Sequence, residues 1–97
     1  MRTNKAKQKL KSGKPSIGTW LTLGSFHAAR VLARMGYDWL TIDAEHIPYD
    51  WREISMLVST IADAGCAPLI RVPDGSHSTI KRALDAGAYG VVVPIRL

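Results

Sequence analysis

Apolar and polar residues follow a pattern that occurs three times along the chain. Each repeat has an amphipathic stretch, then a glycine, then a short apolar run. The apolar runs cover 39–42, 69–72 and 91–93, and the glycines before them are Gly36, Gly65 and Gly87. Because glycine tolerates the left-handed conformation that often ends a helix, each repeat predicts a helix followed by a strand. Good N-cap residues precede the three predicted helices: Ser25, Asp50 and Ser76.

The residues before the first repeat predict one more strand and one more helix. The strand covers 16–23, and an opening helix begins near Asn4 and is ended by Gly13. The helix that follows Asp50 has the clearest amphipathic pattern, because its apolar residues recur at helical spacing. These residues are Ile54, Leu57, Val58 and Ile61.

Helices and strands therefore alternate in the order αβαβαβαβ, with no signal for a hairpin. Strands separated by helices pair in parallel through right-handed crossovers, which predicts an α/β protein with a parallel sheet. Two architectures remain open: a small doubly wound sheet, or half of a (β/α)₈ barrel of about 250 residues. The chain stops at Leu97, directly after its last predicted strand. That position favours the half-barrel.

Polar residues gather where two of the predicted strands end. The first strand leads into Asp43, Glu45 and His46, and the next ends at Arg71. Since the carboxyl ends of parallel strands meet at one edge, where α/β proteins bind their ligands, we expect an active site there. Each residue also has a local alternative: a surface ion pair for Arg71, a helix cap or turn for Asp43, and a loop cap for His46.

Length and composition indicate one small globular domain. The chain has 97 residues, of which 46% are hydrophobic and 22% charged. It contains no run of about 18 apolar residues, so we expect no membrane partner. Its single cysteine, Cys66, is expected to be a buried core residue in a protein of the reducing cytoplasm.

The net charge of +5 is concentrated at the N-terminus. Six of the thirteen Lys and Arg residues lie before residue 15 with no acidic residue among them, which leaves seven basic and eight acidic residues afterwards. The lysines step by two and therefore scatter around a helix, and no aromatic side chains stand between them to stack on bases. This pattern predicts a solvated helix and no nucleic-acid partner.

The combined order of several short motifs resembles the HpcH/HpaI aldolase family. The matching segments are 17–20 (IGTW), 36–39 (GYDW), 42–46 (IDAEH), 68–73 (PLIRVP), 80–88 and 92–94. The resemblance implies a TIM-barrel fold, of which residues 1–97 would form a single partial domain with about four βα units.

The resemblance also implies a chemistry and a set of roles. Family members are metal-dependent (class II) aldolases that cleave 4-hydroxy-2-oxo acids to pyruvate and an aldehyde. His46 matches the acid–base histidine, and Arg71 matches the arginine that binds the oxo acid and stabilises its enolate. Asp85 matches an aspartate that partners the histidine across a subunit interface. Asp43 matches an aspartate close to the metal-bound water.

Two weaker expectations and one cofactor complete the implied site. Trp20 would bind substrate and Glu45 would line the pocket or support it. The family uses a divalent metal, expected to be Mg²⁺, Mn²⁺ or Co²⁺, whose Glu and Asp ligands come from later strands and are absent from this chain. A Schiff-base mechanism would need a lysine inside the barrel, whereas Lys81 lies in a predicted helix.

Two hypotheses for the function follow. The first is the N-terminal half of a cytoplasmic, homo-oligomeric aldolase for small 2-oxo acids, inactive as this truncated chain. The alternative is a non-catalytic interaction module that pairs with a complementary fragment or with intact subunits.

Overall fold

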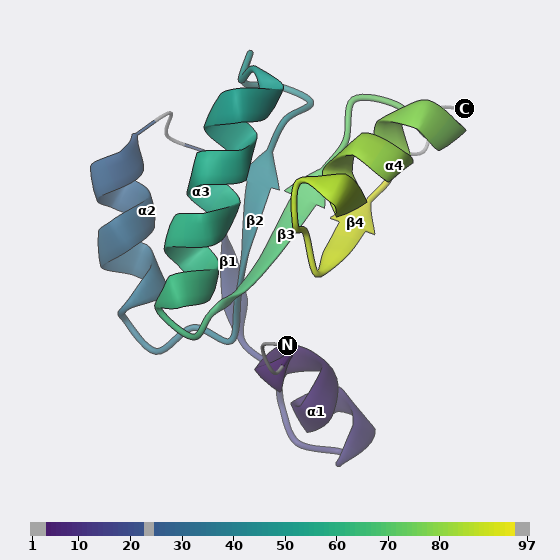
Figure 1. Ribbon diagram of the computed structural model, residues 1–97. Coiled ribbons are helices and arrows are strands. Elements are labelled where there is room, and N and C mark those ends of the chain that lie inside the picture. Colours follow the sequence, from purple (N-terminus) through teal and green to yellow (C-terminus); the bar gives the residue numbers. More distant parts are fainter. Residues whose placement is uncertain (1–3, 23–24, 95–97) are drawn as a thin grey trace.

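The predicted alternation of helices and strands is confirmed. A computed structural model of the chain describes residues 4–22 and 25–94. The elements are α1 (Lys5–Lys11), β1 (Gly18–Leu21), α2 (Phe26–Ala33), β2 (Trp39–Asp43), α3 (Trp51–Asp63), β3 (Ala67–Arg71), α4 (His77–Asp85) and β4 (Gly90–Val92). The strands form one parallel sheet in the order β1-β2-β3-β4 (Figure 1).

Local signals in the sequence set the helix boundaries. The three predicted N-cap residues, Ser25, Asp50 and Ser76, each accept a hydrogen bond from a backbone N–H of the first turn. Asn4, near which the opening helix was predicted to begin, does the same for α1. At α3, the Glu53 side chain also accepts from the Asp50 backbone, which completes a capping box. Gly36, with φ of +95°, lies just beyond α2 in the left-handed conformation that was expected of it.

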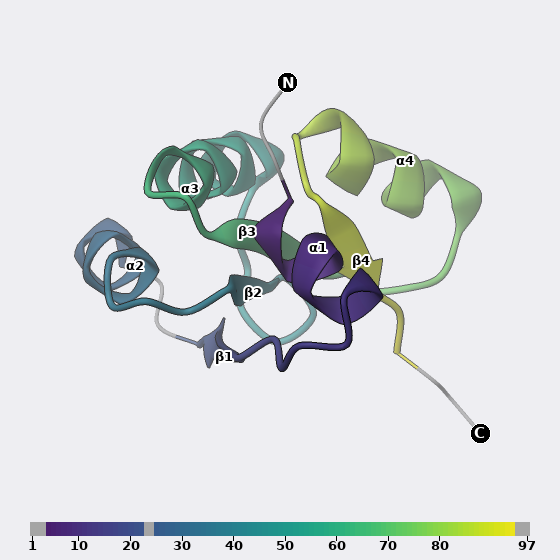
Figure 2. The same cartoon turned by 90° about the horizontal axis from the view of Figure 1, so that it is seen from below.

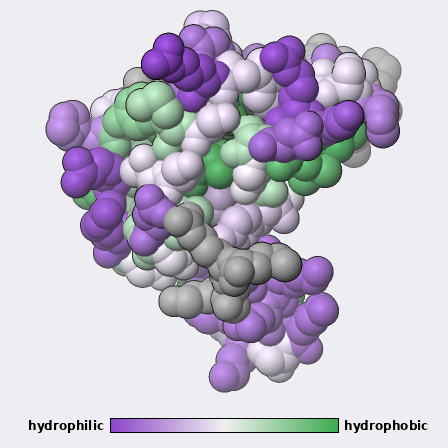
Figure 3. Space-filling model, viewed as in Figure 1, coloured by the Kyte–Doolittle hydropathy of each residue, from purple (hydrophilic) through white to green (hydrophobic). Residues whose placement is uncertain are grey.

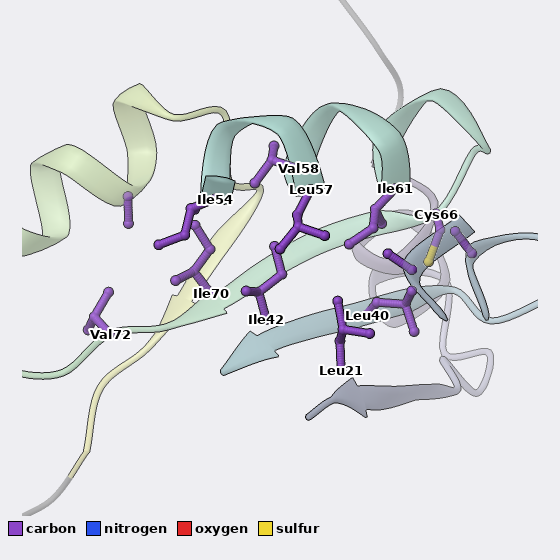
Figure 4. Close-up of a cluster of buried hydrophobic side chains, with 13 residues drawn as sticks. Leu21, Leu40, Ile42, Ile54, Leu57, Val58, Ile61, Cys66, Ile70 and Val72 are labelled. Carbon is purple, nitrogen blue, oxygen red and sulfur yellow. The ribbon is translucent and has the colours of Figure 1, made fainter. Parts of the chain in front are cut away.

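Helices α2, α3 and α4 pack on one face of the sheet (Figure 2). The predicted apolar stripe of α3 is buried there, and Figure 4 shows Leu57 and Ile61 projecting from α3 toward Ile42 and Leu40 of β2. Cys66 is buried in the same cluster, as expected, and burial raises the pKa of its thiol to about 11. Since side chains alternate along a strand, the neighbours of these core residues on β2 point to the opposite face.

Strand boundaries differ from the sequence expectation by one or two residues. β3 begins at Ala67, two residues before the predicted start, because the Ala67 N–H donates to the Asp38 carbonyl at 2.9 Å and extends the ladder. β1 is shorter than predicted and ends at Leu21; Leu23, the predicted last residue, lies outside the described residues. Such shifts are expected because pairing, which sets strand ends, depends on the neighbouring strand.

α1 lies below the amino ends of the strands (Figure 1) and is linked to them through Asp38. Lys9 Nζ is 2.7 Å from Asp38 Oδ1, and the Ile17 N–H donates to Asp38 Oδ2 at 2.8 Å. Most of α1 is hydrophilic and exposed (Figure 3), which agrees with a solvated helix. Asp38 is buried, and Lys9 of α1 forms an ion pair with it. Lys9 therefore contacts the rest of the fold, although α1 as a whole is solvated.

No helix within residues 4–22 and 25–94 is both long enough and apolar enough to cross a bilayer.

The position of Asp38 predicts that its carboxylate matters more than the lysine it pairs with. Asp38→Ala should lower the free energy of unfolding by about 1–3 kcal/mol, because the Ile17 N–H loses its acceptor in a part-buried position and the buried Asp38 carboxylate is removed. Lys9→Met should cost less than about 1 kcal/mol, since the Lys9 side chain is 43% exposed. Urea unfolding of both variants measures the difference. Equal losses of unfolding free energy in the two variants would contradict the prediction that the Asp38 carboxylate matters more than Lys9.

Candidate active site

The carboxyl ends of the first three strands bring the candidate residues together. β2 ends at Asp43 and β3 ends at Arg71, and the strand register pairs these two residues directly. Their side chains therefore share the face of the sheet that lies opposite α2–α4. Glu45 and His46 follow in the turn after β2, and Trp20 lies on the neighbouring strand β1.

Asp43 and Arg71 form a bidentate ion pair at the centre of this cluster. Arg71 Nε donates to Asp43 Oδ1 at 3.1 Å, and Arg71 Nη2 donates to Asp43 Oδ2 at 2.5 Å. The side chains are only 4% and 24% exposed, so the pair is not the surface ion pair that local sequence allowed. A planar guanidinium held at two points has a fixed orientation, which a lysine could not provide.

The Asp43 carboxylate also holds the turn after β2. Its Oδ1 accepts from the backbone N–H groups of Glu45 and His46 at 3.1 and 3.0 Å. Burial by itself raises the pKa of Asp43, but the hydrogen bonds from Arg71 and His46 outweigh it and lower the pKa from 3.8 to about 2. The same hydrogen bond to Asp43 raises the pKa of Arg71. Both groups are therefore charged at neutral pH.

His46 contacts both members of the pair through one ring nitrogen. Its Nδ1 lies 2.8 Å from Arg71 Nη2 and 3.2 Å from Asp43 Oδ2. Its Nε2 lies 3.8 Å from Glu45 Oε1, and the side chain is 62% exposed. An exposed imidazole beside a part-buried ion pair is accessible to a ligand and can exchange protons with it, which a fully buried histidine cannot do as readily.

Trp20 and Glu45 surround the Arg71 side chain. The Arg71 Cζ atom lies 4.4 Å from the centre of the Trp20 ring, within the range of a cation–π interaction. Glu45 Oε2 lies 3.7 Å from Arg71 Nε. The structure thus places both of these weaker candidates in the cluster, and Trp20 contacts Arg71 directly.

Asp85 lies apart from the other candidates. It is an exposed residue at the end of α4 and lines a surface hollow with Trp51, Ser55, Arg82 and Ala86. The structure does not bring it to His46 within this chain, whose carboxylate contacts come from Asp43 and Glu45. Its role as the partner of the histidine across a subunit interface stays a prediction.

The cluster does not fit direct coordination of a metal. Across residues 4–22 and 25–94, no group of three or more His, Cys, Asp or Glu side chains is arranged to hold a cation. Both oxygens of Asp43 already accept hydrogen bonds from Arg71, whose positive charge opposes a cation beside this carboxylate. The chemistry of these residues is that of an anion site with an adjacent imidazole.

Sequence reasoning missed the direct pairing of Asp43 with Arg71. Both residues were candidates, but Asp43 was assigned to the surroundings of a metal and Arg71 to the substrate. The signal was the common position of the two residues at the ends of successive strands of equal length, Trp39–Asp43 and Ala67–Arg71.

Comparison with known proteins places the chain among aldolases. A family model described as HpcH/HpaI aldolase/citrate lyase matches residues 16–95. A hydroxypyruvate/pyruvate aldolase from Paraburkholderia phytofirmans is 45% identical over 94 residues, covering 95% of this chain and 36% of the relative. A 4-hydroxy-2-oxovalerate aldolase from Rhodococcus jostii is 41% identical over 93 residues, covering 95% of this chain and 36% of the relative.

A solved structure agrees with these matches. The crystal structure of an HpcH/HpaI aldolase/citrate lyase family protein from Burkholderia cenocepacia superposes with a TM-score of 0.84 and 44% identity. The match covers 97% of this chain and 38% of that protein. The four parallel strands and the helices between them therefore correspond to part of a TIM barrel, and the chain spans little more than a third of the length of these relatives.

The low pKa of Asp43 predicts a specific loss of stability in acid. Because the folded state holds this pKa near 2 and the unfolded value is about 3.8, the unfolded state binds more protons between these values. The stability that Asp43 contributes is complete above the unfolded value and disappears as the pH falls from about 5 to 2. Over that interval the native protein should lose about 2 kcal/mol more than Asp43→Asn. Urea unfolding at several pH values measures this difference, and parallel pH profiles would contradict it.

Proposed function

Because the chain belongs to the HpcH/HpaI aldolase/citrate lyase family, we propose that it forms part of a metal-dependent (class II) aldolase. The reaction is cleavage of a 4-hydroxy-2-oxo acid to pyruvate and an aldehyde. The observation that carries this proposal is the Asp43–Arg71 pair with His46 beside it, at the carboxyl ends of β2 and β3. The names of the relatives from P. phytofirmans and R. jostii support an oxo acid as substrate.

Arg71 binds the oxo acid in this proposal. Asp43 and His46 engage the donors on Nε and Nη2, and among the described residues no contact of Nη1 competes for a substrate oxygen. A guanidinium fixed by a carboxylate and a tryptophan ring is oriented before the ligand arrives, so little ordering is needed on binding. Its charge stabilises the enolate oxygen that develops when the carbon–carbon bond breaks.

His46 moves the proton of the reaction. Cleavage requires that the C4 hydroxyl lose its proton while the bond between C3 and C4 breaks, and that C3 of the enolate later gain one. An imidazole titrates near neutral pH and can do both. Its exposure leaves room for a substrate, and Asp43 Oδ2 lies 3.2 Å from its Nδ1.

The remaining parts of the proposal concern groups outside this cluster. A divalent cation, Mg²⁺, Mn²⁺ or Co²⁺, would supply Lewis-acid chemistry, with ligands from residues other than those of this chain. Subunits would form a homo-oligomer in which the exposed Asp85 of one subunit approaches His46 of another. The unpaired, buried thiol of Cys66 supports a reducing cytoplasmic location.

A second candidate function is a non-catalytic module that pairs with the complementary part of a barrel. It is favoured by the arrangement of α2–α4, which all lie on one face of the sheet (Figure 2). In a TIM barrel the other face is buried by the remaining strands. This candidate shares the fold of the first but requires no turnover, so activity measurements separate the two.

Activity should require more than these 97 residues. The isolated chain should release no pyruvate above background from a 4-hydroxy-2-oxo acid, with Mg²⁺, Mn²⁺ or Co²⁺ added, because it covers 36% of its relatives and holds no cation site among its described residues. A lactate dehydrogenase assay measures the pyruvate released.

The chain joined to the matching C-terminal part of the P. phytofirmans aldolase, here called the completed barrel, should be active in the same assay. Metal-stimulated turnover by the isolated chain would contradict the first expectation, and an inactive, folded completed barrel would favour the second candidate function.

Substitutions in the completed barrel should separate proton transfer from substrate binding. His46→Ala should lower kcat by roughly 10²–10⁴-fold, the usual effect of losing a general acid–base group. Arg71→Lys keeps the positive charge but loses the bidentate guanidinium, so it should raise KM and lower kcat/KM. Steady-state kinetics of the two variants measure the split. An Arg71→Lys variant with the parent's kinetics would assign Arg71 to a structural ion pair.

A further inference from the structure

The contact between Arg71 and His46 determines which imidazole nitrogen faces the site. We propose that Arg71 fixes His46 in the tautomer with the proton on Nε2, and that Nδ1 is the atom that takes the substrate proton. The assignment of Nδ1 to the reaction rests on the proposed aldolase function. The tautomer itself follows from the geometry and can be tested without any turnover.

The first argument is the direction of the hydrogen bond. Arg71 Nη2 lies 2.8 Å from His46 Nδ1, and a guanidinium only donates. Nδ1 must therefore present its lone pair to Arg71. In neutral imidazole only one nitrogen carries a proton, so the proton of His46 is on Nε2.

The competing acceptor for a proton on Nδ1 is Asp43. Its Oδ2 lies 3.2 Å from Nδ1, which is longer than the contact with Arg71, and it already accepts from Arg71 Nη2 at 2.5 Å. Its other oxygen accepts from Arg71 Nε and from two backbone N–H groups. The Asp43 carboxylate already has several donors and gains little from one more. The Arg71 guanidinium, in contrast, gains an acceptor when Nδ1 carries no proton. Arg71 therefore decides the tautomer in the free site.

The other side of the ring agrees with this assignment. Glu45 Oε1 lies 3.8 Å from His46 Nε2, and a carboxylate near this nitrogen favours a proton on it. The Glu45 side chain is only 17% exposed, so its charge is partly shielded from solvent. Nδ1 thus lies beside a donor, and Nε2 lies near an acceptor.

The arrangement couples substrate binding to activation of the base. The carboxylate of an oxo acid is a better acceptor for a guanidinium than a neutral nitrogen is, so it replaces Nδ1 as the acceptor of the second N–H of Nη2, while the first N–H stays on Asp43. The freed lone pair accepts the proton of the C4 hydroxyl: the O–H bond breaks as the N–H bond forms. The electrons of that hydroxyl form the aldehyde carbonyl, and those of the broken carbon–carbon bond form the enolate. Asp43 Oδ2 is then in place to accept a hydrogen bond from the new Nδ1–H.

The first experiment reads the tautomer in the 97-residue protein. Histidine labelled with ¹⁵N shows well-separated signals for ring nitrogens with and without a proton, at a pH where histidine side chains are neutral. His46→Gln identifies the signals of position 46 among the three histidines. The expected result is an excess of the Nε2–H form of about tenfold or more, from a hydrogen bond to a charged donor.

Arg71 variants distinguish tautomer control from a bystander contact. In Arg71→Met the donor is lost and Asp43 becomes the partner of Nδ1, so the ratio should turn toward the Nδ1–H form. Arg71→Lys retains a donor and should preserve the native preference at least partly. A native protein with mostly Nδ1–H, or a ratio that Arg71→Met leaves unchanged, would overturn the proposal.

The second experiment leaves Arg71 intact and therefore does not depend on the folding of its variants. Nδ-methylhistidine at position 46 of the completed barrel blocks Nδ1 and leaves Nε2 available. The expected kcat falls to the level of His46→Ala, and a kcat within a few-fold of the parent would assign the proton transfer to Nε2. If the parent completed barrel itself is inactive, the proposed function fails, while the ¹⁵N spectra still decide the tautomer.

Discussion

The buried carboxylate of Asp43 is the group on which the functional part of this structure depends. It is 4% exposed and accepts hydrogen bonds from the Arg71 side chain and from two backbone N–H groups of the following turn. A buried carboxylate without such partners would be costly to ionise. With them, its pKa falls to about 2, and the carboxylate is negatively charged at neutral pH. The turn that carries His46 and the orientation of Arg71 both follow from this one ionised group.

This arrangement suits an anion better than a cation. Arg71 neutralises Asp43 and places a positive group at the carboxyl end of β3, stacked on the ring of Trp20. An arriving carboxylate meets a donor that is already oriented. A metal ion would instead have to displace the guanidinium from Asp43, which makes this carboxylate a poor ligand. In the proposed enzyme, residues of this chain bind and exchange protons, and other residues hold the cation.

The register of the parallel strands positions Asp43 and Arg71. The pairing of Asp43 with Arg71 follows from the register of two parallel strands, each packed against α3 on the other side. Leu40 and Ile42 point into that core, so the residues between and after them face the site. A shift of one residue in this register would turn Asp43 toward the core. The apolar packing of α3 therefore maintains the geometry of the polar cluster.

Much of the fold could be predicted because its signals are local. N-cap residues such as Asp50 and glycines such as Gly36 specify helix ends through contacts within a few residues, and the structure places them as expected. The order of helices and strands then implies a parallel sheet by general rules of connection. Strand ends such as the start of β3 at Ala67 were less accurate, because they depend on the neighbouring strand.

The sequence by itself also determined which residues stand at the strand ends, and so nominated Asp43, His46 and Arg71. It did not determine their partners. That Asp43 binds Arg71 28 positions away, that Trp20 stacks on that arginine, and that Asp85 lies elsewhere on α4 were decided by the tertiary structure alone. The physical reason is that hydrogen bonds and charge interactions act over a few ångströms in space. The packing of the strands, and not the distance along the chain, sets which groups come within that range.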